Sequence, residues 1–198
     1  MRKLILQMQM SVDGFMAARN GMDWQLWGWG DNWRWDDVLK RDFNAVFDDI
    51  DCILLSRKMA EEGYLDHWGR AATAFAADPH YAFARRIVAV QKVVTSSQLT
   101  TSRWPRTTVI NGDLASAVGT LKQQPGGDII VFGGVGFASA LVAANLVDEY
   151  QLFVNPAALG AGEGIFGSQR DGLPLRLIRS TAYSCGMVVN RYAAGAAG

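Results

Sequence analysis

The segment from Asp128 to Glu149 constrains the fold more than any other part of this 198-residue chain. It opens with four consecutive apolar residues, 129–132, the pattern of a strand that is covered on both faces. Small and apolar residues at 138–144 then favour a helix. The turn between them is Gly133-Gly134-Val135-Gly136. Adjacent glycines leave backbone amides open to a ligand, so the segment predicts either a tight structural turn or a phosphate-binding turn.

This glycine turn differs from the dinucleotide fingerprint of a Rossmann fold. In the pattern Gly134-x-Gly136-x-x-Ser139, a serine takes the place of the third glycine, and no acidic residue follows about twenty residues later. The turn also lies late in the chain, so too few residues remain for the further βαβ units of a Rossmann domain.

Composition predicts a single well-buried domain, which we place at residues 1–192, followed by a flexible tail at 193–198. Nineteen basic residues balance nineteen acidic ones without a basic cluster, which argues against a nucleic-acid partner. No apolar run reaches membrane-spanning length, and the first residues are too polar for a signal segment. Cys52 and Cys185 fit free thiols in a reducing compartment, so a cytoplasmic protein is expected.

The order of apolar patterns predicts an α/β fold. Strands are expected at 3–10, 52–56, 92–95, 107–110, 129–132, 147–154, 175–182 and 187–192. Helices are expected at 35–50, 78–89, 114–122 and 138–144, and another helix is expected to begin at residue 57. Residues 66–77 are expected to form an irregular connection. Because strands alternate with helices first and then follow one another, a mostly parallel sheet with antiparallel C-terminal edge strands is predicted.

Three features are candidates for a binding site, and each has a structural alternative. Asp42 lies at the edge of an apolar helix face, where it lines a cleft or is a solvated boundary charge. Arg57 and Lys58 follow a buried strand, where they hold a phosphate or are solvated cations. Five tryptophans between residues 24 and 35 stack on a heteroaromatic ligand, or fill a gap or form a subunit contact.

Other chemistries lack their residues. His67 and His80 are the only histidines and have no metal-ligand spacing with the cysteines, so no metal site is expected. The chain also has no G-x-S-x-G nucleophile elbow and no G-x-x-x-x-G-K phosphate loop.

Several segments together resemble one family. They are Ser11-x-Asp13-Gly14, Leu55-Ser56-Arg57, Lys92-Val-Val-Thr-Ser96-Ser-x-Leu99, Asp128-Ile-x-Val-x-Gly133-Gly134, Leu146-Val-Asp148-Glu149, Pro156-x-x-Leu159-Gly160-x-Gly162 and Phe166. Their order and spacing over residues 1–192 resemble the reductase domain of riboflavin biosynthesis and its dihydrofolate reductase-like relatives, in a stand-alone form.

The resemblance implies a dihydrofolate reductase-like three-layer α/β/α fold, an NADPH cofactor, a pyrimidine- or pterin-like substrate and a homodimer. The expected activity is that of a 5-amino-6-(5-phosphoribosylamino)uracil reductase or a dihydrofolate reductase. Carried over by position, the cofactor-binding residues are Ser56, Arg57, Lys58, Thr95, Ser96, Ser97, Gly133, Gly134, Val135 and Gly136. Gly14 and Trp24 are expected to contact the substrate, and Asp42 and Asp13 are the catalytic candidates.

The chain departs from the family pattern in two places. The first-helix carboxylate of dihydrofolate reductases falls near Lys40 here, so neither Asp37 nor Asp42 matches it cleanly. The histidine and cysteine signature of the zinc deaminase that accompanies the bifunctional riboflavin enzyme is also missing. Two alternatives to a reductase therefore stay open: a catalytically silent nucleotide-binding module and a dimeric interaction protein of the same fold.

Overall fold

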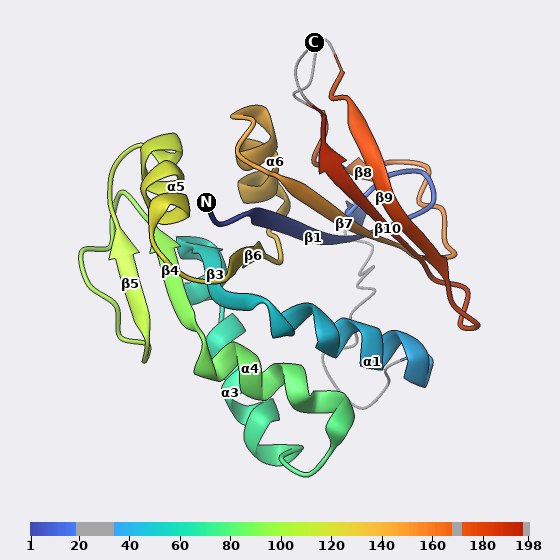
Figure 1. Cartoon of the computed structure of the whole chain (residues 1–198), viewed down its shortest axis with the longest axis horizontal. Coiled ribbons are helices and arrows are strands. Elements are labelled where there is room, and N and C mark those ends of the chain that lie inside the picture. Colours follow the sequence, from blue (N-terminus) through green and yellow to red (C-terminus); the bar gives the residue numbers. More distant parts are fainter. Residues whose placement is uncertain (19–33, 168–171, 196–198) are drawn as a thin grey trace. The chain divides into compact units, whose positions relative to one another are not determined.

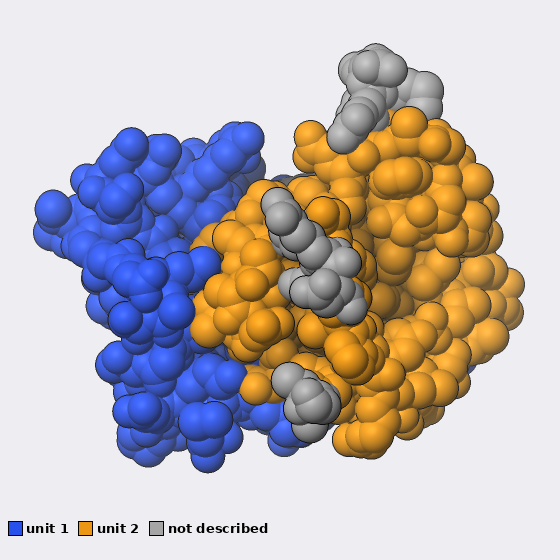
Figure 2. All heavy atoms as spheres, turned by 90° about the horizontal axis from the view of Figure 1, so that it is seen from above, with its two compact units in different colours: residues 1–4, 37–131 blue, residues 5–36, 132–198 orange. Residues whose placement is uncertain are grey.

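The computed structural model describes residues 1–18, 34–167 and 172–195, and its eight-stranded sheet has the order β5-β4-β3-β6-β1-β7-β10-β9 (Figure 1). Chain contacts divide the protein into two compact units, residues 1–4 with 37–131 and residues 5–36 with 132–198 (Figure 2). Within the described ranges, every helix is too short or too polar to cross a bilayer. The boundaries predicted from composition, 1–192 and 193–198, stay a prediction.

The first unit is built from a parallel sheet and its connecting helices. Its elements are α1 (Asp37–Ala45), the 3₁₀ turn η1 (Val46–Asp48), β3 (Ile50–Ser56), α2 (Arg57–Glu61), α3 (Tyr64–Ala74), the 3₁₀ turn η2 (Pro79–Tyr81), α4 (Ala82–Ala89), β4 (Gln91–Thr95), β5 (Thr107–Ile110), α5 (Leu114–Gln123) and β6 (Asp128–Val131). Strand β3 pairs in parallel with both β4 and β6, and β4 pairs in parallel with β5. Consecutive residues of β3, such as Ile53 and Leu54, are almost fully buried, so both faces of this strand are covered.

An aromatic cluster fills the core of this unit beside its helices. Phe43 of α1 and Trp68 of α3 both meet Phe83 of α4 edge to face, with ring centroids 5.1 Å and 4.8 Å apart. Edge-to-face pairs of this kind add stability beyond the area that they bury. The cluster therefore fixes α1, α3 and α4 against one another.

The second unit ends in the antiparallel strands that the sequence predicts. Its elements are β1 (Leu4–Met10), of which Leu4 is assigned to the first unit, β2 (Ala17–Ala18), α6 (Val135–Ala143), β7 (Glu149–Val154), β8 (Gly162–Glu163), β9 (Leu175–Ala182) and β10 (Val188–Ala194). Strand β1 pairs in parallel with β7, whereas β10 pairs antiparallel with both β7 and β9. The short strands β2 and β8 form a separate antiparallel pair. The predicted mostly parallel sheet with antiparallel C-terminal strands is confirmed.

Two sequence expectations are wrong. The helix expected over 35–50 ends earlier, and Ile50 is the first residue of β3. Residues 66–77, expected to be irregular, lie mostly in α3, whose buried face is Tyr64, Trp68 and Ala71. The start expected at Asp78 is confirmed, because its carboxylate accepts a hydrogen bond from the His80 amide at 2.8 Å.

Candidate functional site

The glycine turn after β6 leads directly into α6. Gly133 has φ +124°, a conformation that favours glycine, and a Cβ placed there would lie 3.4 Å from the Met8 sulfur. Gly134 is the N-cap of α6, with φ −26° and ψ 152°. In this turn Gly133 therefore has the positive φ that requires glycine, whereas the φ of Gly134 is negative.

The start of α6 is open in the way that an anion site requires. No side chain of the described residues caps this helix, and a Cβ at Gly134 or Gly136 would meet nothing within 4 Å. The first amides of a nine-residue helix have no partner within the helix and carry its positive dipole end. An uncapped start with free space in front of it can bind a phosphate.

Asp13 lies in the loop after β1 and ties that loop to a second one. Its carboxylate accepts hydrogen bonds from the Ser11 hydroxyl at 2.6 Å, the Leu159 amide at 3.1 Å and the Gly160 amide at 2.6 Å. The Ser11 hydroxyl, followed by the Leu159 and Gly160 amides, lowers the pKa of Asp13 to about 2. Asp13 is therefore ionised at neutral pH and holds the two loops together.

Gly14, an expected substrate contact, belongs to the same loop. It has φ +90°, and a Cβ added to Gly164 would come within 3.3 Å of its carbonyl oxygen. The short strands β2 and β8 pair beside this loop, with Ala17 opposite Glu163. The loop after β1 is thus clamped to residues 159–164. Trp24, the other expected substrate contact, lies outside the described residues.

Of the tryptophan segment, the structure describes Trp35. Its side chain is 9% exposed and stacks on Phe153 of β7, with ring centroids 5.5 Å apart. For this one tryptophan, the structural role of filling an apolar gap is the one observed.

The strand ends of the first unit bring two groups of predicted cofactor residues together. Ser56 is the register partner of Thr95, so the ends of β3 and β4 lie at the same edge of the sheet. The Ser56 hydroxyl caps α2 by accepting the Met59 amide at 3.1 Å. Ser96 accepts the Gln98 and Leu99 amides, at 3.0 and 2.8 Å, in a tight turn that begins one residue after Thr95.

Asn111 completes this edge and was missed by the sequence reasoning. Its side-chain amide donates to the carbonyls of Ser96 and Leu99, each at 2.6 Å. It therefore holds the Ser96 turn to the end of β5. The Asn111-Gly112-Asp113 motif at a strand end was the available signal, but it indicates a turn rather than a contact with the neighbouring strand.

Arg57 and Lys58 both have acidic partners, on α2 and at its C-cap. Arg57 pairs with Glu61, and the Lys58 ammonium lies 3.7 Å from the Glu62 carboxylate. Their side chains are 38% and 79% exposed. Such exposed pairs are weak, so an incoming phosphate could displace them at low cost.

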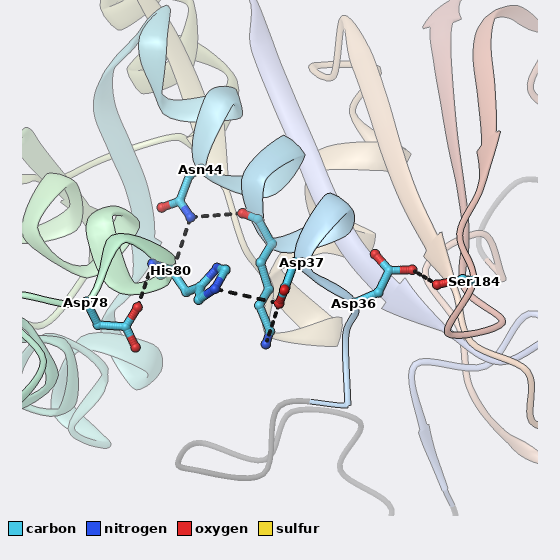
Figure 3. Close-up of polar contacts among 7 residues, drawn as sticks. Asp36, Asp37, Asn44, Asp78, His80 and Ser184 are labelled. Atoms are coloured by element: carbon cyan, nitrogen blue, oxygen red, sulfur yellow. Dashed lines mark hydrogen bonds and ion pairs between the residues drawn. The ribbon is translucent and has the colours of Figure 1, made fainter.

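Three aspartates lie on α1 or directly before it, and each has different partners; Figure 3 draws Asp36 and Asp37. Asp37 lies 3.6 Å from both the Lys40 ammonium and the His80 imidazole. Asp36, just before the helix, accepts the Ser184 hydroxyl at 2.7 Å in the β9–β10 turn (Figure 3). Asp42 lies 3.8 Å from the Arg41 guanidinium and is 38% exposed, so it has a partly open carboxylate.

A buried polar row across the second unit was also missed. Gln7 of β1 pairs in register with Gln151 of β7, which pairs in register with Arg191 of β10. Gln7, Gln151 and Glu149 are each 3% exposed. The alternation of glutamine with leucine and methionine in β1 suggested a strand, but its partners on β7 and β10 follow only from the register.

The mostly parallel sheet, its antiparallel final strands and the glycine turn before α6 define a dihydrofolate reductase-like α/β protein. The chain belongs to the RibD C-terminal domain family, whose model matches residues 2–189. The family resemblance seen in the sequence is thereby confirmed.

The chain is similar to proteins of its own length and to part of a longer one. It is 27% identical over 188 residues to YyaP, an uncharacterised protein of Bacillus subtilis (strain 168), covering 94% of this chain and 92% of YyaP. A crystal structure from Shewanella sp. PV-4, provisionally assigned to riboflavin biosynthesis, aligns with TM-score 0.66 at 18% identity over 98% of this chain and 99% of that one. The Thermotoga maritima diaminohydroxyphosphoribosylaminopyrimidine deaminase/5-amino-6-(5-phosphoribosylamino)uracil reductase aligns with TM-score 0.64 at 13% identity, over 98% of this chain but 57% of that protein.

Proposed function

We propose that this protein is an NADPH-dependent reductase of a pyrimidine- or pterin-like ring. The observation that carries the proposal is the uncapped start of α6, where Gly134 and Gly136 leave open space in front of the helix amides. Family membership supports it, as does the reductase activity in the name of the Thermotoga maritima protein. When bound, NADPH supplies the hydride.

Each group of predicted cofactor residues, taken within its own unit, suits one part of that cofactor. The amides of residues 134–136 would bind its pyrophosphate, because they begin a helix without a side-chain cap and, among the described residues, a Cβ at Gly134 or Gly136 meets nothing within 4 Å. Arg57 and Lys58 would pair with the 2′-phosphate, which distinguishes NADPH from NADH. Thr95 and the Ser96 turn, held by Asn111, would shape the adenosine end.

The two aspartates have different proposed roles. Asp13 keeps the loop after β1 in place, since the Ser11 hydroxyl and the Leu159 and Gly160 amides all donate to it, which favours the ionised form and leaves it a poor proton donor at neutral pH. Asp42 is the proposed ionisable group on the substrate side, where it would deliver or relay a proton to the ring that accepts the hydride.

The test is NADPH binding by the variant Gly134→Val, measured by calorimetry beside the native protein. Because φ at Gly134 is negative and no atom of the residues that the structure describes lies within 4 Å of its Cβ position, the fold should tolerate valine at a cost of about 1 kcal/mol or less. The branched side chain would occupy the space of the phosphate. We expect NADPH affinity to fall more than about tenfold, equivalent to ~1.4 kcal/mol.

The matched control is Gly119→Val, in α5, where a Cβ also meets nothing within 4 Å. This control should bind NADPH normally, and the native protein should bind NADPH more tightly than NADH. Normal NADPH binding by a cooperatively folded Gly134→Val protein would refute the phosphate site. Tight NADPH binding without turnover of any pyrimidine or pterin would instead favour a silent nucleotide-binding module.

A further inference from the structure

Two glutamines on β1 form an unusual pair, which we call the β1 amide pair: Gln7 and Gln9. They are two residues apart in a strand, so their side chains extend from the same face with Cα atoms roughly 7 Å apart. Among the described residues, the Gln7 Oε1 atom and the Gln9 Nε2 atom are both buried and have no hydrogen-bond partner. One is an acceptor and the other a donor.

The orientation of the Gln7 amide is fixed by a chain of hydrogen bonds that begins at an ion pair. Arg191 donates to the Glu149 carboxylate, with its Nη2 atom 2.6 Å away. That carboxylate can only accept, so Gln151 directs its NH₂ group to it at 3.1 Å. The Gln151 oxygen must then accept from the Gln7 NH₂ group, at 3.1 Å, which leaves Gln7 Oε1 as the free end of the chain.

The Gln9 amide is fixed from the other side by Asn155. The Asn155 NH₂ group lies near three acceptors, the carbonyls of Met10 and Phe153 and the Gln9 oxygen at 3.3 Å. Three acceptors around one group identify it as the donor. The Gln9 oxygen is therefore occupied, and its NH₂ group is the end left free.

The surroundings make these free ends costly. Phe153 is the register partner of Gln9 and is covered by the stacked Trp35 ring. A buried polar atom without a partner loses its hydrogen bonds to water and gains none in return, which destabilises the protein. Two such atoms of opposite character on adjacent positions of one face are the complement of an amide, which offers an N–H beside a C=O.

From this geometry we infer that the β1 amide pair binds an amide edge of the ligand, with Gln7 Oε1 accepting the ligand N–H and Gln9 Nε2 donating to the ligand carbonyl. The ligand class is a planar ring with a lactam group, or a ring bearing a carboxamide. This inference rests on the proposed function, because that site would hold both a lactam substrate and the carboxamide of a nicotinamide.

The experiment measures 5-aminouracil binding to the protein without cofactor, by ligand-observed NMR, for the native chain, Gln7→Met and Gln9→Met. Derivatives methylated at N1 and at N3 remove one N–H at a time. In the native protein, one of the two methylations should weaken binding about tenfold. In Gln7→Met the same methylation should change nothing, because the acceptor that recognised that N–H is gone.

A second arm distinguishes the substrate from the cofactor as the source of the amide. If the pair binds the nicotinamide, Gln7→Met should lower NADPH affinity. Replacing the carboxamide of the cofactor by an acetyl group, which lacks the N–H, should then weaken binding to the native protein but not to Gln7→Met. If the pair binds the substrate, NADPH affinity should be the same in all three proteins. Gln91→Met, at an exposed position of β4, is the control for the substitution itself.

The two proposals fail in different ways. The reductase proposal is contradicted if the native protein does not bind NADPH. The amide-pair inference can still be tested in that case, because 5-aminouracil binding is measured without any cofactor. The inference is overturned if the native protein binds neither 5-aminouracil nor NADPH through this pair, or if methylation weakens binding equally in native and Gln7→Met proteins. Melting curves establish that each glutamine variant is folded at the temperature of the measurement.

Discussion

Asp42 is the residue on which the chemistry can be tested most directly. Its carboxylate is partly exposed and pairs at 3.8 Å with the exposed Arg41, so Asp42→Asn should change stability by less than about 0.5 kcal/mol. A group that delivers a proton in the reaction contributes roughly 10²–10⁴-fold to turnover. We expect the variant to bind NADPH normally and to lose turnover of 5-amino-6-(5-phosphoribosylamino)uracil or dihydrofolate by that factor.

Asp37→Asn is the matched control on the same helix, since Asp37 is 80% exposed and contacts Lys40 and His80 (Figure 3). It should keep full activity. Equal turnover in native and Asp42→Asn proteins would show that Asp42 has no catalytic role and is a solvated charge at the edge of the apolar helix face.

At the scale of the element, Asp13 makes one loop depend on another. Replacing it by asparagine removes the negative charge and one of the two oxygens that accept from the Leu159 and Gly160 amides, so hydrogen exchange at those two amides should accelerate. Its folded pKa, about 2, lies below the ordinary value of about 3.9 for an aspartate. The stability that Asp13 contributes is therefore present above about pH 4 and is lost as pH falls towards 2.

The measurement is thermal unfolding of native and Asp13→Asn proteins between pH 2 and 7. The two melting temperatures should differ at pH 5–7 and converge near pH 2. Asp113→Asn removes a comparable carboxylate that caps α5, and it should leave the Leu159 and Gly160 amides protected. A constant difference across the pH range would mean that the Asp13 charge is not the cause.

Local sequence patterns predicted most of the helices and strands. They failed where packing and strand pairing between distant segments determine the secondary structure. Residues 64–74 have a buried face at helical spacing, but the alanines between them obscured it, and Gly63 at φ +96° begins the helix without a side-chain cap. Ile50 fits the apolar period of the preceding helix, yet pairing with Asp128 of β6 recruits it into β3. Short apolar segments are ambiguous between helix and strand for this reason.

The candidate site was predictable to the extent that it lies in contiguous motifs. The glycine turn and the Ser56 strand end were visible in the sequence, because each is a few residues long. The β1 amide pair was not, since the direction of the Gln7 amide depends on Gln151 and Arg191, which reach it only through the strand register. Polar residues in a buried strand acquire a meaning only when their cross-strand neighbours are known.

At the scale of the whole molecule, strand β9 is the end of the sheet order and exposes apolar side chains. Leu177 is 53% and Ile178 46% exposed, on opposite faces of the strand. An exposed apolar edge strand is a surface for pairing with another chain. We propose that it contributes to the homodimer that the family resemblance implies.

Sedimentation at micromolar concentration should therefore show a dimer for the native protein and a monomer for the double variant Leu177→Lys, Ile178→Lys. Val88→Lys places a lysine at a similarly exposed apolar position of α4 and should stay dimeric. A native monomer, or a dimer that survives both lysines, would contradict this assignment.

The position of β1 in the sheet also has a consequence for synthesis of the chain. Its neighbours in the strand order are β6 and β7, so a nascent chain has made neither of them until it has passed residue 127. Gln7 and Gln151 are separated by 144 positions, and closing a loop of that length costs about 4 kcal/mol in chain entropy. Strand β1 is thus synthesised long before both of its partner strands, and its leucines and methionines have no sheet neighbours until β6 and β7 have been made.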